Sequence, residues 1–261
     1  MLPKLLKTAI SAGKAILDIY NERNYDIESK QDDSPLTTAD LASNKIINEN
    51  LQTLGLPILS EENRQLPYEQ RKDWNEFLLV DPLDGTKEFI KRNGEFTVNI
   101  ALIRNHLPVM GVIYAPVPDT LYWGSEEEGS WRLEKASQKF NKNNIAEGAQ
   151  KLPIEGPDPG KLRVVASKSH FSKETEDFIN SLDKGNKKIT LVSRGSSLKL
   201  CMLAEGTADI YPRLGPTMEW DTGAGHAIAK FAGCDVRVYD SDDELKYNKE
   251  DLLNPYFIVK M

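Results

Sequence analysis

The sequence has few of the residues that would cross-link the chain or bind soft metals. It contains 2 cysteines, Cys201 and Cys234, and 3 histidines in 261 residues. Two isolated thiols without metal-ligand spacing argue against a disulfide framework and against a zinc cluster, and they suit a reducing compartment. We therefore expect both cysteines to be buried and to act as small apolar residues.

Long apolar runs and an excess of positive charge are also missing. No stretch approaches the ~18 apolar residues that cross a bilayer, and the first residues enter an amphipathic pattern rather than a signal peptide. We therefore expect a cytoplasmic protein without an integral membrane segment. The net charge of −7 argues against a nucleic-acid partner, which needs a basic surface. A small phosphorylated substrate remains compatible, because local charges and metals decide its binding.

The most informative stretch is Asp-Pro-Leu-Asp-Gly-Thr-Lys-Glu-Phe at 81–89. It follows an apolar run that predicts a buried strand, and two carboxylates at the end of a strand are ligands of the kind that Mg²⁺ prefers. Gly85 and Thr86 would then begin a helical turn whose free N–H groups favour an anion. An ordinary Asp-Gly turn is the simpler interpretation, so the motif needs support from the rest of the chain.

The first part of the chain predicts helices followed by hairpins. Apolar residues recur at helical spacing over 2–22 and 38–54, and the segment 95–133 alternates short β-rich runs with turns. Such short connections predict an antiparallel meander. The charged stretch 29–35 is either a mobile surface loop or an acidic flap over a metal site.

The second part alternates strands and helices. The polar stretch 135–160 predicts a junction, so we expect domains at 1–155 and 156–261. Strand–helix alternation after residue 162 predicts a mixed or mostly parallel sheet with helices on its faces. The helix beginning near Glu219 is rich in Gly and Ala, which predicts a tight approach to a neighbouring element because glycine is costly inside a helix.

Polar residues gather at the predicted strand ends and helix starts. The acidic ones are Asp40, Glu61, Asp81, Asp84 and Asp221. Helix capping or pairing with the helix dipole would alone explain Asp40 and Asp221. If buried together, however, these acids would repel one another unless two or more Mg²⁺ ions bind them. The basic and hydroxyl residues, which suit a second phosphate, are Lys168, Ser169, His170, Arg194, Ser196, Lys199 and Arg213.

Together these motifs resemble the lithium-inhibited, magnesium-dependent inositol monophosphatase superfamily. The likeness is carried by Glu61-Glu62, by Asp81-Pro82-Leu83-Asp84-Gly85-Thr86 and by Trp220-Asp221-Thr222. The string 87–97, beginning Lys-Glu-Phe, looks like the bacterial 3'(2'),5'-bisphosphate nucleotidases of the CysQ type, whereas inositol monophosphatases usually carry Thr-Asn-Phe there. The likeness covers the chain apart from 135–160. It implies an α+β half and an α/β half stacked as αβαβα layers, with the site between them.

The resemblance also implies metal and catalytic roles at matched positions. Glu61, Asp81 and the Leu83 carbonyl would hold one Mg²⁺, and Asp81, Asp84 and Asp221 a second, with a third, weaker ion near Glu61 and residues 33–40. Asp40 and Thr86 would prepare the attacking water with help from Glu61. The N–H groups of Gly85 and Thr86 would hold the scissile phosphate beside Glu61, Leu83, Asp84 and Asp221.

The implied contacts to the nucleotide and its second phosphate are Ser169, His170, Ser196, Lys199 and Arg213. A capping role for His170 and a solvated Lys199 are the simpler alternatives. The implied reaction is hydrolysis of the 3'-phosphate of adenosine 3',5'-bisphosphate, and of 3'-phosphoadenylyl sulfate, in sulfur assimilation and nucleotide recycling.

Two other functions remain open from the sequence. One is an inositol or sugar phosphatase of the same fold, against which the Lys87-Glu88-Phe89 signature speaks. The other is a non-catalytic metal or nucleotide sensor, which would be expected to have lost a ligand or Thr86. A monomer and a homodimer are both compatible with the sequence, as is peripheral attachment to the cytoplasmic face of the inner membrane, although no anchor is evident.

Overall fold

The computed structural model describes the chain except residues 23–26, 30–34, 65, 167–171 and 183–184. Lys168, Ser169 and His170 therefore lie outside the described residues, as does most of the predicted flap. Two short strands flank that flap, β1 (Ile27–Ser29) and β2 (Pro35–Thr37), and they pair antiparallel.

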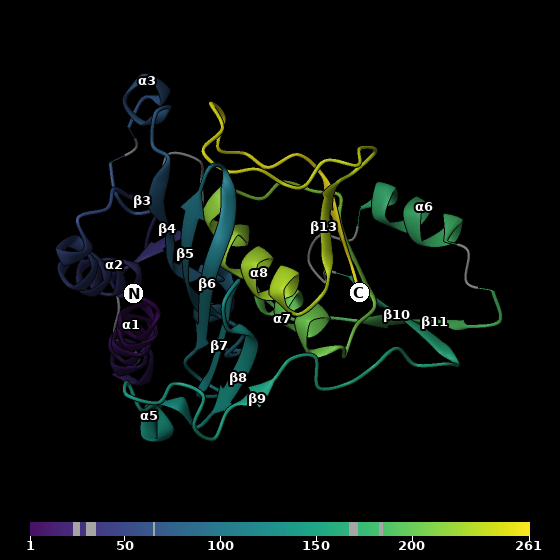
Figure 1. Cartoon of the computed structure of the whole chain (residues 1–261), viewed down its shortest axis with the longest axis horizontal. Coiled ribbons are helices and arrows are strands. Elements are labelled where there is room, and N and C mark those ends of the chain that lie inside the picture. Colours follow the sequence, from purple (N-terminus) through teal and green to yellow (C-terminus); the bar gives the residue numbers. More distant parts are fainter. Residues whose placement is uncertain (23–26, 30–34, 65, 167–171, 183–184) are drawn as a thin grey trace.

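The elements form five layers, as predicted (Figure 1). Helices α1 (Leu2–Glu22) and α2 (Thr38–Leu51) cover one face of a seven-stranded sheet. Helices α7 (Leu198–Glu205) and α8 (Glu219–Phe231) lie between this sheet and a five-stranded one. Helix α6 (Lys173–Ser181) lies on the far side of the second sheet.

The seven-stranded sheet contains the predicted meander. Its strands, in spatial order, are β3 (Ile58–Ser60), β4 (Glu76–Asp84), β5 (Thr97–Arg104), β6 (Leu107–Ala115), β7 (Thr120–Ser125), β8 (Gly129–Glu134) and β9 (Gln150–Lys151). The pair β3–β4 is parallel, and the remaining neighbours are antiparallel. Strand β9 lies inside the predicted junction, so part of that stretch extends the first sheet.

Several short elements complete the first half. They are the 3₁₀ helix η1 (Gln52–Leu54), α3 (Tyr68–Arg71), α4 (Thr86–Ile90) and α5 (Ala136–Lys139). The helix expected over 38–54 therefore changes to 3₁₀ geometry after Leu51. It ends at Gly55, whose φ of 69° lies in the left-handed region that glycine adopts freely.

The five-stranded sheet is mixed, as predicted. Its order is β11 (Lys188–Val192), β10 (Lys161–Val165), β12 (Ile210–Arg213), β14 (Phe257–Lys260) and β13 (Asp235–Val238). Strands β11, β10 and β12 run parallel, while β14 is antiparallel to both neighbours. Pro212 and Arg213 belong to β12, because they pair with Ile258 and Phe257 of β14.

Helix α8 approaches its neighbours as closely as its small residues predict. A Cβ at Gly111 of β6 would lie 2.3 Å from the Ala224 carbonyl oxygen, and one at Gly225 would lie 2.3 Å from a Leu200 methyl group. Cys201 and Cys234 are free and buried, which confirms the expectation for the thiols. None of the described helices combines the length with the apolar character that crossing a membrane requires.

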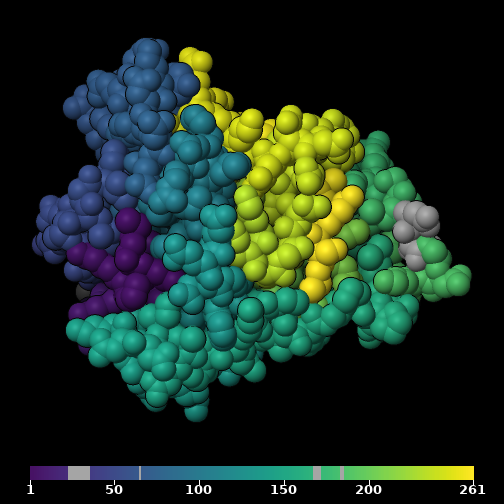
Figure 2. Space-filling view, viewed as in Figure 1, coloured from purple at the N-terminus to yellow at the C-terminus, as the bar shows by residue number. Residues whose placement is uncertain are grey.

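Figure 2 shows how the two halves of the chain meet on one face of the molecule. In Figure 2 the C-terminal residues, in yellow, lie between the blue-teal first half and the green part of the second half. The segment that contains α5 and β9 runs along one edge of the molecule from the first half toward the second, as both views show.

Candidate active site

Strand β4 is longer than the sequence predicted. It includes both aspartates of the motif, Asp81 and Asp84. Asp81 pairs with Asn99 and Asp84 pairs with Thr97, and the register shifts between these pairs. The shift accommodates Pro82, which has no N–H for the ladder. Ser43 donates a hydrogen bond to the Pro82 carbonyl at 2.6 Å, and the Leu83 N–H donates to Asp81 at 3.0 Å.

The other four predicted acidic residues all act electrostatically on Asp81. Asp81 is only 1% exposed, and burial raises its pKa well above the ordinary value. The negative charges of its four neighbours raise it further; in decreasing order of effect they are Glu61, Asp84, Asp221 and Asp40. Burial and then Asp84 raise the pKa of Asp221 to about 8. A cation would relieve this repulsion, so the donor set fits a hard divalent ion.

The carboxylates also receive hydrogen bonds from the protein. Asp84 accepts the Ser197 N–H at 2.5 Å, and Asp221 accepts the Met218 N–H at 2.9 Å in the first turn of α8. With the side chains in these positions, no group of three or more His, Cys, Asp or Glu residues in the described part of the chain is placed to hold a metal ion.

Asp40 caps α2 with one carboxylate oxygen and contacts Thr86 with the other. Oδ2 accepts hydrogen bonds from the Thr37 N–H at 2.8 Å and the Thr37 hydroxyl at 2.5 Å, which caps α2. Oδ1 accepts a hydrogen bond from the Thr86 hydroxyl at 3.2 Å. Capping therefore uses one oxygen and leaves the other for contact with Thr86.

Gly85 lies where the backbone makes a sharp turn between β4 and α4. Its φ is 94°, and a Cβ there would lie 3.2 Å from Ser196 Cβ and from the Glu95 carbonyl oxygen. Both observations favour glycine. The turn opens onto a cavity of about 250 Å³ that is lined by Glu61, Asp81, Leu83, Asp84, Gly85, Thr86, Lys87, Glu88 and Asp221.

A second, smaller cavity of about 80 Å³ shares Asp84 and Asp221 with the first. Ser196, Lys199 and Arg213 also line it, so three of the predicted nucleotide contacts lie beside the acidic cluster. Lys199 is 9% exposed and lowers the pKa of Asp84 against the larger effect of burial. The buried Nε of Arg213 has no hydrogen-bond partner within the described residues.

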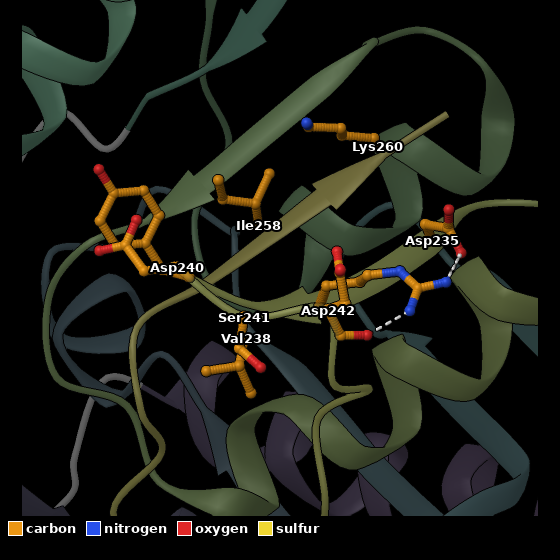
Figure 3. A pocket seen from close by; sticks show the side chains of 9 residues that line it. Asp235, Val238, Asp240, Ser241, Asp242, Ile258 and Lys260 are labelled. Atoms are coloured by element: carbon orange, nitrogen blue, oxygen red, sulfur yellow. Dashed lines mark hydrogen bonds and ion pairs between the residues drawn. The ribbon is translucent and has the colours of Figure 1, made fainter.

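Two other positive groups do not join this site. Arg194 is exposed and lies 3.5 Å from Glu95 instead of lining either cavity. A larger cavity of about 550 Å³ lies on the outer side of β13 and β14, and Figure 3 shows its lining. There the guanidinium of Arg237 donates hydrogen bonds to Asp235 at 3.2 Å and to the Asp242 carbonyl, so part of its donor capacity is used by neighbouring oxygens.

The sequence interpretation overlooked Thr97, Asn99 and Ser197. Asn99 Nδ2 lies 3.3 Å and Thr97 Oγ1 3.5 Å from Asp84 Oδ2, the same oxygen that Ser197 contacts. A signal existed in the sequence, because Thr97 and Asn99 are polar residues two apart in a run of apolar ones and therefore share one face of β5. For Ser197, only the helix start after it was informative.

Known proteins resemble this chain over its whole length. A model of the inositol monophosphatase family matches residues 2–260. A 3'(2'),5'-bisphosphate nucleotidase CysQ from Salmonella typhimurium is 44% identical over 99% of each chain, and one from Escherichia coli K12 is 42% identical over 100% of each. The crystal structure of CysQ from Bacteroides thetaiotaomicron, 46% identical, superposes with a TM-score of 0.86 over 97% of this chain and 94% of that one.

A more distant solved structure shares the fold alone. The extragenic suppressor protein suhB from Bartonella henselae is 21% identical, with a TM-score of 0.74 over 99% of this chain and 93% of that one. The layered architecture and the full-length matches therefore agree with the resemblance seen in the motifs. The chain belongs to the inositol monophosphatase family.

Proposed function

We propose that this protein is a Mg²⁺-dependent phosphatase that hydrolyses the 3'-phosphate of adenosine 3',5'-bisphosphate, giving AMP and phosphate. 3'-Phosphoadenylyl sulfate is the second expected substrate, which would place the enzyme in sulfur assimilation and nucleotide recycling. We call the cavity of about 250 Å³ around Asp81 and Gly85 the acidic cavity, and the cavity of about 80 Å³ that contains Lys199 and Arg213 the basic cavity. The observation that carries the proposal is that these two cavities adjoin, because Asp84 and Asp221 line both. The names of its CysQ relatives support the same reaction.

The acidic cavity suits the scissile phosphate together with its metals. Glu61, Asp81, the Leu83 carbonyl, Asp84 and Asp221 offer only oxygen donors, which is the ligand type that Mg²⁺ requires. Two or three bound Mg²⁺ ions would supply positive charge to the phosphate oxygens and acidify water. The N–H groups of Gly85 and Thr86 begin α4 and have no acceptor within that helix, so they are available to a phosphate oxygen.

Thr86 and Asp40 would orient the attacking water. Since the Thr86 hydroxyl donates its proton to Asp40 at 3.2 Å, the lone pairs of that hydroxyl are left to accept a hydrogen bond from water. Such a bond directs the water's remaining lone pair toward the phosphorus atom and favours in-line attack. Glu61, which lines the same cavity, would help to take up the proton.

The basic cavity suits the second phosphate of the substrate. Lys199 Nζ donates to the Ser196 carbonyl at 3.0 Å, which leaves further N–H donors on the ammonium group for a phosphate. Arg213 Nη2 donates to the Pro216 carbonyl at 2.6 Å, which holds the guanidinium at the wall of the cavity. We include Ser169 and His170 among the proposed nucleotide contacts on the resemblance alone.

A direct comparison of substrates tests the proposal. Phosphate release would be measured from adenosine 3',5'-bisphosphate and from inositol 1-phosphate, each with Mg²⁺, without Mg²⁺ and with Li⁺ added. We expect fast, Mg²⁺-dependent and Li⁺-sensitive release from the nucleotide. Preference for the inositol ester would keep the acidic cavity as the reaction site but contradict the role given to Ser196, Lys199 and Arg213.

A further inference from the structure

The turn at 194–197, which carries Ser196 into the basic cavity, is held by residues of the segment 95–99. The Gly195 N–H donates a hydrogen bond to Glu95 Oε2 at 2.9 Å, and Arg194 Nη1 lies 3.5 Å from Glu95 Oε1. The carboxylate of Glu95 therefore contacts the beginning of the turn at two points, the backbone N–H of Gly195 and the side chain of Arg194. Charge-assisted hydrogen bonds of this kind are stronger than neutral ones.

The far end of the same turn is bound to the acidic cluster. The Ser197 N–H donates to Asp84 at 2.5 Å, and the Ser197 hydroxyl donates to Asn99 Oδ1 at 2.9 Å. Thr97, which is fully buried, shares hydrogen bonds with the hydroxyl of Ser197 at 2.7 Å and with that of Ser196 at 3.3 Å. Ser196 thus lies between two fixed points, Glu95 on one side and Asp84 on the other.

Close packing leaves this turn little room to move. A Cβ at Gly195 would lie 2.8 Å from both the carbonyl oxygen and the Cβ of Glu95. Ser196 itself has a φ of 44°, a left-handed conformation that non-glycine residues adopt only when their surroundings impose it. A Cβ at Gly85 would lie 3.2 Å from the Cβ of Ser196. The turn therefore directly faces Gly85 and Thr86, which we call the phosphate loop.

We propose that Glu95 is a positioning residue for substrate specificity, because it fixes the distance between the phosphate loop at Gly85-Thr86 and the second-phosphate site at Ser196 and Lys199. This inference rests on the proposed function. Glu95 is not among the described residues that line either cavity, so it acts through the turn rather than on the substrate. The fixed distance favours a substrate with two phosphates over one with a single phosphate.

The test compares two substrates that differ only in the second phosphate, adenosine 3',5'-bisphosphate and adenosine 3'-monophosphate. In Glu95→Ala we expect KM for the bisphosphate to rise about tenfold, since a charge-assisted hydrogen bond that holds the turn is lost. We expect kcat for the bisphosphate and kcat/KM for the monophosphate to stay unchanged. Glu95 is 29% exposed, so its removal should leave the fold intact.

Binding without turnover gives a second measurement. AMP keeps the second phosphate and lacks the scissile one, so calorimetry should show its affinity falling about tenfold in Glu95→Ala, by the same lost hydrogen bond. The affinity for inorganic phosphate should not change. Glu95→Gln keeps an oxygen that can accept the Gly195 N–H, so it should restore most of the AMP affinity.

The matched control is Glu76→Ala. Glu76 is 32% exposed and forms an ion pair with Arg104 at 2.6 Å, outside both cavities, so its loss should change neither substrate's constants. Equal losses for both substrates in Glu95→Ala, or no loss for either, would overturn the positioning role. Failure of the proposed function itself looks different, because the unmodified protein would then not hydrolyse the bisphosphate at all.

Discussion

At the scale of single residues, the site is defined by negative charges that the fold holds close together. Asp81 and Asp221 have pKa values raised by burial and by neighbouring carboxylates. Such an arrangement opposes folding unless protons or cations neutralise it. This conflict between stability and charge gives two predictions.

The first concerns Asp84→Asn. The amide keeps the size of the side chain and an oxygen that can accept the Ser197 N–H, but it loses the negative charge that a metal ion needs. We expect kcat/KM to fall at least about 100-fold, with an unchanged or slightly higher unfolding midpoint. Steady-state kinetics and circular dichroism measure these quantities.

Asp119→Asn is the control for this change. Asp119 accepts hydrogen bonds from Tyr114 at 2.8 Å and from Ser137 at 2.7 Å and lies outside both cavities, so activity should be retained. If Asp84→Asn kept activity within about tenfold of the unmodified protein, the metal-ligand role of Asp84 would be wrong, since loss of a ligand costs more than that.

The second prediction concerns the pH dependence of stability in the metal-free protein. The pKa of Asp221 is about 8 in the fold against an ordinary value of 3.8, so between these pH values the folded state holds a proton that the unfolded state has released. Stability must therefore fall as pH rises through this window. With a chelator present, the unfolding midpoint should drop by several degrees from pH 5 to pH 8.5.

Asp221→Asn separates this effect from other titrations. The variant cannot ionise, so its midpoint should fall less over the same range, with a residual slope from Asp81, whose pKa is also raised. Parallel curves for the two proteins would show that Asp221 is not the group responsible. Added Mg²⁺ should stabilise the unmodified protein more at the higher pH, where the carboxylates are charged.

The sequence allowed the acidic residues to be predicted but not how they are held. Asp81, Asp84 and Asp221 stand out because each follows a strand or begins a helix. Their supports are ordinary residues, such as Thr97 and Ser197, whose significance arises only when β5 and the start of α7 meet. Thr97 and Ser197 are 100 positions apart in the sequence, so no local pattern predicts that they are in contact.

At the scale of elements, the position of Asp221 depends on how closely α8 approaches the first sheet. We predict that Gly111→Ala destabilises the protein by about 2–3 kcal/mol, because overpacking a tight contact forces the helix away from the strand. The new methyl group would lie 2.3 Å from the Ala224 backbone oxygen, which cannot move without moving α8. Chemical denaturation measures the loss, and kcat should fall as well.

Gly156→Ala is the matched control. A Cβ at Gly156 meets nothing within 4 Å, and its φ is not in the left-handed region, so stability should be unchanged or slightly raised. Equal stabilities for the variants at 111 and 156 would mean that the contact between β6 and α8 can relax freely.

Elements with a strong periodic pattern could be predicted, while short ones needed tertiary context. Residues 2–22 gave a helix with correct bounds, since its apolar residues recur over several turns. Strands β13 and β14, of 4 residues each, were not predicted. Strand β9 was assigned to a linker, since 2 polar residues become a strand only by pairing with β8.

At the scale of the whole molecule, the two predicted domains share a layer of helices. Helix α8 belongs to the second half in sequence but packs along five strands of the first sheet, and it also contacts β13. Arg71 of α3 adds a polar link by donating to the side chain of Asn248 at 2.8 Å, and the Asn248 N–H donates to Glu219 of α8 at 2.6 Å.

This sharing predicts a single cooperative unfolding transition. Far-UV circular dichroism and tryptophan fluorescence should give coincident midpoints, since Trp123 lies in the first sheet and Trp220 lies in α8. Two separated transitions would instead show that residues 1–155 and 156–261 unfold as independent domains. The domain boundary predicted near residue 155 would then also separate two units that unfold independently.

The place of β14 has a consequence for the order in which a growing chain can fold on the ribosome. The seven-stranded sheet has all its strands once residue 151 has been synthesised. The five-stranded sheet does not, because β14 lies between β12 and β13 and is the last strand to be made. Translation must therefore reach residue 260 before all the strands of that sheet are present. The first half of the nascent chain can thus fold before the second half, which completes the site, is able to do so.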